Sequence, residues 1–229
     1  MRLTAATAAT AVVVVAIAGC CGSMLLVSAA QADAAAGGGI EDGWEYVTSG
    51  STLKLSHTKS NTRLTMPQVG YGTGSQQQAV TTQSDASQTK ALWAIELAPN
   101  SESASEPEAA RGSRIPCGSR IRLVNSDTRH SLHSHGNHKS PMSGNQEVSG
   151  YEGRDAGDFW TVECAAKGAA KFWLREAPVY FKHVDTGKYL QSLPNKKYRQ
   201  PISGHQEVSA GKKADANAQW MALEGFYFR

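Results

Sequence analysis

The stretch SPMSGNQEVSG (Ser140–Gly150) returns sixty residues later as QPISGHQEVSA (Gln200–Ala210). In each copy Ser-Gly is followed by one variable residue and then by Gln-Glu-Val. Because glycine tolerates positive φ, Ser-Gly predicts a turn, and the residues after it predict a strand that ends with an inward-facing valine. The Gln and Glu would then satisfy backbone groups of the turn or face water. The alternative is a ligand pocket lined by Gln146 and Glu147.

Extending the alignment reveals three copies of one unit. IRLVNSDTRHSLHS (Ile121–Ser134) matches VYFKHVDTGKYLQS (Val179–Ser192), and LKLSHTKSNTRLT (Leu53–Thr65) aligns with the first of these at an offset of 68 residues. An internal repeat of this length indicates a supersecondary unit that buries its apolar face only against the other copies. Each copy ends on a tryptophan, at Trp93, Trp160 and Trp220.

Short apolar or alternating segments separated by turn residues predict strands, and no segment after residue 32 keeps a helical period through three turns. Three units of about four short strands each predict an all-β fold, a β-trefoil of three repeats. Its predicted core takes a leucine, a valine and a tryptophan from each copy: Leu64, Val80, Trp93; Leu132, Val148, Trp160; and Leu190, Val208, Trp220.

The N-terminal residues resemble a secretory signal segment. An apolar run, Ala11–Gly19, follows a single charge at Arg2, and small residues at Ala30–Ala32 suit signal peptidase, so we expect cleavage near Asp33. Two alternatives are an uncleaved anchor and a lipoprotein with its lipid on Cys20. No second apolar segment approaches the roughly 20 residues of a membrane span, so the mature chain is expected not to cross a membrane.

The chain is expected to divide into a signal peptide, a short lead and one trefoil domain. The signal covers residues 1–32, the lead 33–45 and the domain 46–229. Within the domain the three predicted repeats are 46–97, 114–166 and 172–226. An acidic linker at 98–113 joins the first repeat to the second.

Beyond the signal the formal charge is 22 − 20 = +2, and no basic run interleaves with aromatic residues. This pattern gives no support for nucleic-acid binding. Cys117 and Cys164 are the two cysteines left after cleavage, and an even pair in a secretory compartment predicts a disulfide, the alternative being two buried thiols.

Neither catalysis nor metal binding is expected from the sequence. His133 and His135 alternate, so both project from one face of a strand, with His138 three residues on, but polar loop residues are the simpler interpretation. Asp155 and Asp158 precede a tryptophan strand in a glycine-rich turn, where aspartate commonly bonds the backbone. No nucleophile elbow or phosphate loop is present, and no cofactor is expected.

The segment LHSHGNHKSPMSGNQEVSGYEGRDAGDFWTVEC (Leu132–Cys164) resembles the central repeat of the stromal cell-derived factor 2 family, whose members consist of three MIR repeats. QPISGHQEV and WMALEG resemble the third repeat, and GYGTGSQQQAVT the first. The resemblance covers residues 46–226 and implies a β-trefoil. The family has Cys-Gly before its second repeat and a cysteine after the tryptophan of that repeat. These match Cys117-Gly118 and Cys164 here, so the resemblance supports the disulfide. One departure is Ser49, where the family often has cysteine.

The resemblance implies a non-catalytic adaptor in the lumen of the endoplasmic reticulum, with a J-domain co-chaperone, the lumenal Hsp70 and unfolded clients as partners. Alternatives are a lectin-like trefoil that binds glycans, and a MIR module linked to protein O-mannosylation. The chain ends in GFYFR, which is not a KDEL-type signal, so secretion is the alternative localisation.

Two sets of residues are candidates for binding. On polarity and expected exposure, an adaptor would use the second repeat around His133, His135, His138, Gln146 and Glu147. A lectin would instead use exposed aromatic residues in loop-like settings, at Tyr71, Tyr151 or Tyr198.

Overall fold

The computed structural model describes residues 40–85, 87–98, 110–165 and 171–229. These residues form thirteen strands and two short 3₁₀ turns, and no α-helix occurs among them. The predicted signal segment and most of the acidic linker lie outside the described residues. The strands are β1 Thr52–His57, β2 Thr62–Thr65, β3 Gln78–Ala79, β4 Thr81–Gln83, β5 Trp93–Leu97, β6 Arg120–Asn125, β7 Ser131–Lys139, β8 Gln146–Tyr151, β9 Trp160–Cys164, β10 Val179–His183, β11 Tyr189–Lys197, β12 Gln206–Gly211 and β13 Trp220–Phe226; the 3₁₀ turns are η1 Thr89–Ala91 and η2 Ala156–Asp158.

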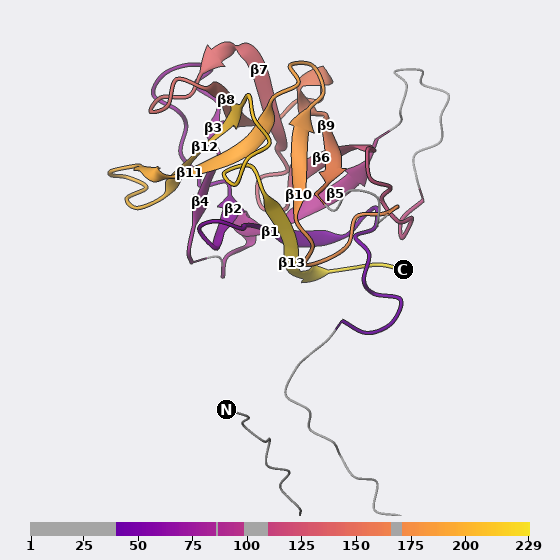
Figure 1. The fold of residues 1–229 in the computed structure, drawn as a ribbon. Helices are drawn as coiled ribbons and strands as arrows, with labels where there is room; N and C mark the ends of the chain where they lie inside the picture. Colours follow the sequence, from indigo (N-terminus) through magenta and orange to yellow (C-terminus); the bar gives the residue numbers. More distant parts are fainter. Residues whose placement is uncertain (1–39, 86, 99–109, 166–170) are drawn as a thin grey trace, which may run out of the picture. The chain divides into compact units, whose positions relative to one another are not determined.

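Six strands close into a ring, which lies on the right of Figure 1. All pairings are antiparallel and run β1–β13–β10–β9–β6–β5 and back to β1. Each repeat therefore contributes its first and last strand to the ring. The closed ring leaves no free edge among its six strands, which removes the usual template for unwanted strand pairing.

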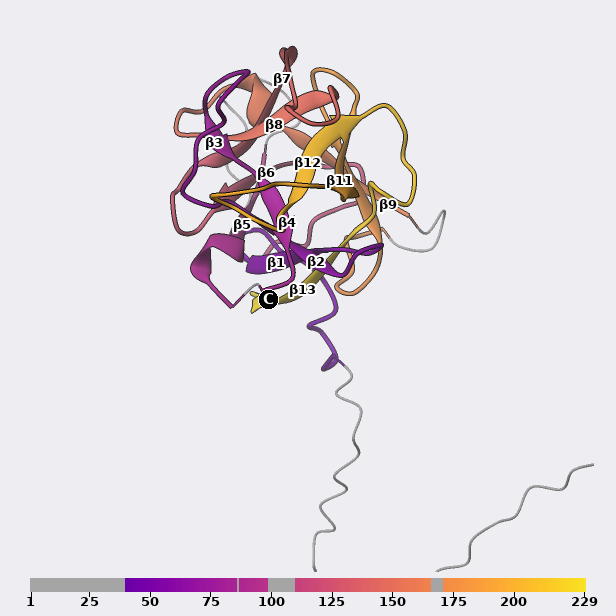
Figure 2. The same ribbon diagram turned by 90° about the vertical axis from the view of Figure 1, so that its left-hand side faces the viewer.

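The inner strands of each repeat form a cap over one end of the ring. The hairpins are β2 with β4, β7 with β8, and β11 with β12, and they are joined where β12 pairs with both β4 and β8. The cap faces the viewer in Figure 2. A six-stranded ring with three linked hairpins is a β-trefoil, as the repeats predicted.

The end of the ring opposite the cap is closed by a triangle of backbone hydrogen bonds. Val47 N–H donates to Trp173 O at 2.9 Å, Trp173 N–H to Ile115 O at 2.8 Å, and Ile115 N–H to Val47 O at 3.1 Å. These three positions are equivalent in the three repeats, each a few residues before the first ring strand. All three side chains are fully buried.

The core repeats threefold in chemical detail. The nine predicted leucine, valine and tryptophan residues are all 0% exposed and belong to one cluster. Each tryptophan indole donates to the backbone carbonyl of the leucine in its own repeat, and each of the three distances is 2.9 Å. Because a buried indole N–H needs an acceptor, this bond fixes the angle at which the last ring strand meets the hairpin.

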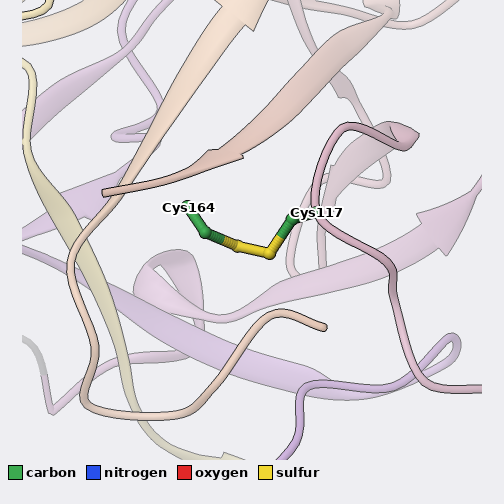
Figure 3. The surroundings of a disulfide bond; sticks show 2 residues. All are labelled: Cys117 and Cys164. Carbon is green, nitrogen blue, oxygen red and sulfur yellow. A yellow bond between two sulfur atoms is a disulfide. The ribbon is translucent and has the colours of Figure 1, made fainter. Parts of the chain in front are cut away.

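Cys117 and Cys164 form a disulfide, with their Cα atoms 5.6 Å apart (Figure 3). The bond ties the segment before β6 to the end of β9, which are the two ring strands of the second repeat. Their sequence separation of 47 residues corresponds to roughly 4 kcal/mol of loop-closure entropy removed from the unfolded chain. In the first repeat the equivalent positions hold Ser49 and Leu97, where Leu97 N–H reaches Ser49 Oγ at 3.5 Å.

Candidate functional site

The repeated Gln-Glu-Val motif links neighbouring repeats across the cap. Glu207, in β12, accepts hydrogen bonds at Oε1 from Ser140 Oγ at 2.7 Å, Met142 N at 2.8 Å and Ser143 N at 3.2 Å. These donors belong to the hairpin turn of the second repeat. The glutamate of one repeat therefore satisfies the turn of the preceding repeat, which explains why the motif occurs twice.

Glu147 does the same for the first repeat. Its carboxylate accepts from Ser75 N at 3.3 and 3.4 Å and from the Ser75 hydroxyl. Gly74 in that turn has φ +70°, and a Cβ there would overlap the Glu147 carboxylate. Ala79 takes the glutamate's place in the first repeat, so the turn of the third repeat has no such acceptor.

The structure corrects the expected exposure of three candidate residues. His133, Gln146 and Glu147 are only 2%, 3% and 2% exposed. The reason is that β8 pairs with β7, β3 and β12, so the hairpin is covered on both sides. Gln146 uses its amide inside the fold, where Nε2 donates to Ser134 Oγ at 2.7 Å.

His135 and His138 remain partly accessible and lie in the end of β7, from His135 to Lys139, which is the exposed arm of this strand. The structure does gather most of the candidates. A small cavity of about 30 Å³ is lined by Ser75, Gln77, His133, His135, His138, Glu147 and Ser149. Gln146 does not line it. Whether this region binds a partner stays a prediction.

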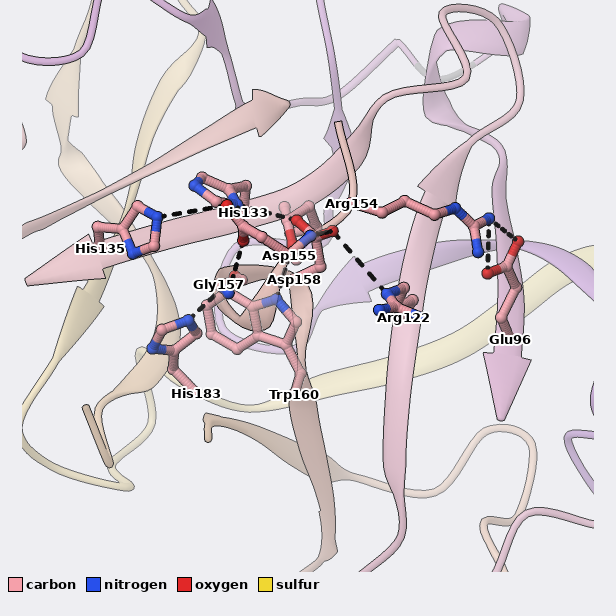
Figure 4. Close-up of polar contacts among 11 residues, drawn as sticks. Glu96, Arg122, His133, His135, Arg154, Asp155, Gly157, Asp158, Trp160 and His183 are labelled. Atoms are coloured by element: carbon pink, nitrogen blue, oxygen red, sulfur yellow. Dashed lines mark hydrogen bonds and ion pairs between the residues drawn. The ribbon is translucent and has the colours of Figure 1, made fainter. Parts of the chain in front are cut away.

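A network of histidine and carboxylate groups adjoins this cavity (Figure 4). His133 Nδ1 lies 2.9 Å from Asp158 Oδ1, and the guanidinium nitrogen Nε of Arg122 lies 3.8 Å from Asp158 Oδ2. Asp155 accepts from Gly157 N at 2.7 Å, and Asp158 accepts from Asp155 N at 3.1 Å, which forms a capping box around η2. The aspartates thus bond the turn backbone, as expected, and Asp158 also holds the imidazole of His133.

The tyrosines expected to form an exposed sugar platform are not exposed in that way. Tyr71 is 7% exposed, its hydroxyl contacts the carbonyls of Val80 and Val148, and burial raises the pKa of its phenol well above the usual value. Burial also raises the pKa of Tyr198. Tyr151 is half-buried and packs on His133, with ring centroids 4.6 Å apart. Tyr71 therefore lies inside the cap, whereas Tyr151 and Tyr198 are half-buried.

A larger hollow of about 500 Å³ lies beside β1 and β5, away from the candidates. Two cationic side chains, Arg111 and Arg129, and one acidic side chain, Glu96, line it together with uncharged residues in and near these strands. Sequence reasoning missed this hollow because its walls come from segments with no distinctive motif. Arg111 also stacks on the Phe228 ring at 4.5 Å.

Among the described residues, no helix is long and apolar enough to cross a membrane.

Comparison with known proteins defines the class first. The family model for the MIR domain matches residues 45–158, which cover the first repeat and most of the second. Among solved structures, the SDF2-like protein from Arabidopsis thaliana superposes with a TM-score of 0.72 at 36% identity, covering 80% of this chain and 97% of that one. The fold is therefore a β-trefoil of the MIR-domain class.

Curated relatives narrow the class further. Human stromal cell-derived factor 2-like protein 1 is 38% identical over 197 residues, which cover 84% of this chain and 83% of the relative. A stromal cell-derived factor 2-like protein from Dictyostelium discoideum is 40% identical over 188 residues, covering 80% and 84%. This chain belongs to the stromal cell-derived factor 2-like family.

A more distant structural neighbour is an enzyme complex. The protein O-mannosyltransferase Pmt1-Pmt2 complex of S. cerevisiae, bound to its sugar donor, matches 80% of this chain with a TM-score of 0.67 at 26% identity. The match covers 26% of that chain, so the similarity is confined to one part of the transferase.

Proposed function

We propose that this protein is a non-catalytic adaptor in a chaperone complex of the endoplasmic reticulum lumen, where it works with a J-domain co-chaperone and the lumenal Hsp70. The observation that carries the proposal is family membership over more than four-fifths of the chain. The chemistry of the cap is consistent with this role. The carboxylates of Glu147 and Glu207 bond turns of neighbouring repeats, which is a structural role.

The second repeat offers the contact surface that we favour. With His133 and Gln146 buried, the accessible part is the arm of β7 from His135 to Lys139, where Gly136, Asn137 and Lys139 are exposed. The arm is polar and projects at the turn end of its hairpin. An exposed strand arm suits reversible contact with another folded protein, since it presents backbone and side-chain groups that are already ordered.

The experiment is co-purification from lumenal extracts, followed by depletion of the J-domain partner. We expect the tagged protein to recover the J-domain protein and Hsp70, and to shift toward the medium after depletion, because binding to a retained complex holds it in the lumen by mass action. If it neither associates before depletion nor shifts afterwards, the adaptor role is wrong.

A charge reversal on the arm tests the surface separately. Lys139 pairs with Gln146 in the second repeat, and Lys197 occupies the same register opposite Gln206 in the third. Both side chains are exposed. We expect Lys139→Glu to weaken co-purification, while the matched control Lys197→Glu leaves it unchanged. Equal effects would remove the arm as the contact surface without removing the adaptor role.

The similarity to the O-mannosyltransferase favours a second candidate, a role linked to protein O-mannosylation. Recovery of a mannosyltransferase in place of the chaperones, in the same co-purification, would support it. A glycan-binding role is weaker because Tyr71 is buried within the cap, and Tyr151 and Tyr198 are half-buried.

A further inference from the structure

Three potential metal ligands converge beside η2 in the second repeat. His133 and His135 project from the same face of β7, and Asp155 comes from the turn after β8 (Figure 4). One donor atom from each residue lies within 4.8 Å of the other two. Asp155 lies twenty residues from His135 in sequence, and the fold alone brings it to the two histidines.

The separations fit ligands around a shared ion better than direct hydrogen bonds. His133 Nδ1 is 3.5 Å from Asp155 Oδ1, and His135 Nε2 is 3.7 Å from Asp155 Oδ2. The second distance is too long for a good hydrogen bond. Two ligand atoms that each lie 2.0–2.1 Å from a tetrahedral zinc ion are about 3.4 Å apart, which is close to both observed distances.

The local charge also favours a cation. Two carboxylates, of Asp155 and Asp158, face the site. Arg122 lies 3.8 Å from Asp158, and Arg154 is paired with Glu96 at 2.9 Å. With neutral imidazoles the group carries a net negative charge. Asp158 is fully buried, and its Oδ1 lies 2.9 Å from His133 Nδ1, so it holds that ring in place through the proposed ligand nitrogen itself. A zinc ion on Nδ1 would replace the proton between the two groups and leave the Asp158 carboxylate beside the ion.

The site is open on one side. The side chains of His135 and Asp155 are 41% and 40% exposed, whereas that of His133 is 3% exposed. His135 has no shorter polar contact among the described residues than the one with Asp155. An ion can therefore enter from solvent and meet a preformed inner ligand, with little rearrangement of the two outer ones.

We propose that His133, His135 and Asp155 bind one zinc ion. His133 Nδ1 releases its proton to solvent when it binds the ion, and the Asp158 carboxylate beside it adds further negative charge. Two imidazoles and a carboxylate are ligands that zinc prefers, and a solvent position completes the four. The bound ion would pin the base of the β7 arm to the η2 turn.

The test is isothermal titration of zinc chloride into protein that has been expressed through a secretory pathway, freed of metal with a chelator, and purified without a polyhistidine tag. We expect saturable binding of one ion and a rise in the thermal unfolding midpoint. His135→Ala and Asp155→Asn should each weaken binding at least about tenfold, the lower bound seen even for outer-sphere partners of metal ligands. Asparagine retains an oxygen for Gly157 N–H, so Asp155→Asn preserves the cap of η2.

His138→Ala is the matched control, since His138 lies on the same strand and lines the adjacent cavity but is not part of the three-residue group. It should bind zinc like the wild type. Far-UV circular dichroism of each variant checks that the fold is intact. The proposal is overturned by an absence of saturable binding in the wild type, or by equal binding in the wild type and both ligand variants.

Discussion

The ring and the cap of this trefoil obey the threefold repeat to different degrees. In the ring, each repeat supplies the same tryptophan, the same indole bond to a leucine carbonyl, and the same link of the backbone triangle. In the cap, two turns are bonded by a glutamate of the next repeat, and the third is not. The ring encloses one core that all three repeats share, so each repeat must fill its part with similar side chains. Each cap turn is bonded separately, so its hydrogen-bond partners can differ from one repeat to the next.

The largest expected effect lies in the ring. Trp220→Ala removes a fully buried side chain and leaves the carbonyl of Leu190 without its indole donor. We expect the free energy of unfolding to fall by about 3–5 kcal/mol, the usual cost of truncating a buried aromatic residue, as measured by urea denaturation. Phe226→Ala is the control, since Phe226 is 71% exposed and should change stability little. Similar losses for both would show that the tryptophan layer is not the common support of the three repeats.

A smaller effect is expected in the cap. Glu207→Ala leaves the Ser140 hydroxyl and the N–H groups of Met142 and Ser143 without their acceptor. We expect a loss of about 1.5–3 kcal/mol, the range for hydrogen bonds to a charged group. The control is Glu224→Ala, which removes a half-exposed partner of Arg63 and should cost below about 1 kcal/mol. If both cost the same, the glutamate does not hold the turn.

The smallest effect concerns the pH dependence of stability. It arises at the end of the first ring strand of each repeat, where the first repeat has His57 and the second has Asn125. His57 Nε2 bonds Asn217 O at 2.9 Å, and Asn125 in the second repeat bonds Lys90 O at the same distance. Burial lowers the pKa of His57. Because the unfolded chain then binds a proton more readily than the folded one, stability is full above about pH 6.5 and falls as the pH drops through the interval down to the folded pKa.

His57→Asn copies the second repeat and should reduce this acid sensitivity. We expect the loss of unfolding free energy between pH 7.5 and 5.5 to shrink by less than about 1.4 kcal/mol, the value of one pKa unit. Parallel urea titrations at the two pH values measure it. An unchanged pH dependence in the variant would show that His57 does not contribute to acid destabilisation.

The features that could be predicted from sequence are those that recur. Leucine, valine and tryptophan that recur in the same order in each copy predicted the fold and the buried core, because three similar units around one axis must bury similar residues. The exposure of His133 and Glu147 could not be judged, since it depends on β8 pairing with strands of two other repeats. The proximity of Asp155 to His133 could not be predicted either, because this contact is made across a turn and no periodic sequence pattern indicates it.

The position of β13 in the ring has a consequence for synthesis of the chain. β13 is the last strand described and lies between β1 and β10. While the polypeptide emerges from the ribosome, both of these neighbours have unpaired edges, and they stay open until β13 is outside. Open edges are prone to pair with other chains, so we expect the nascent protein to depend on protection during translation and the finished one to need none.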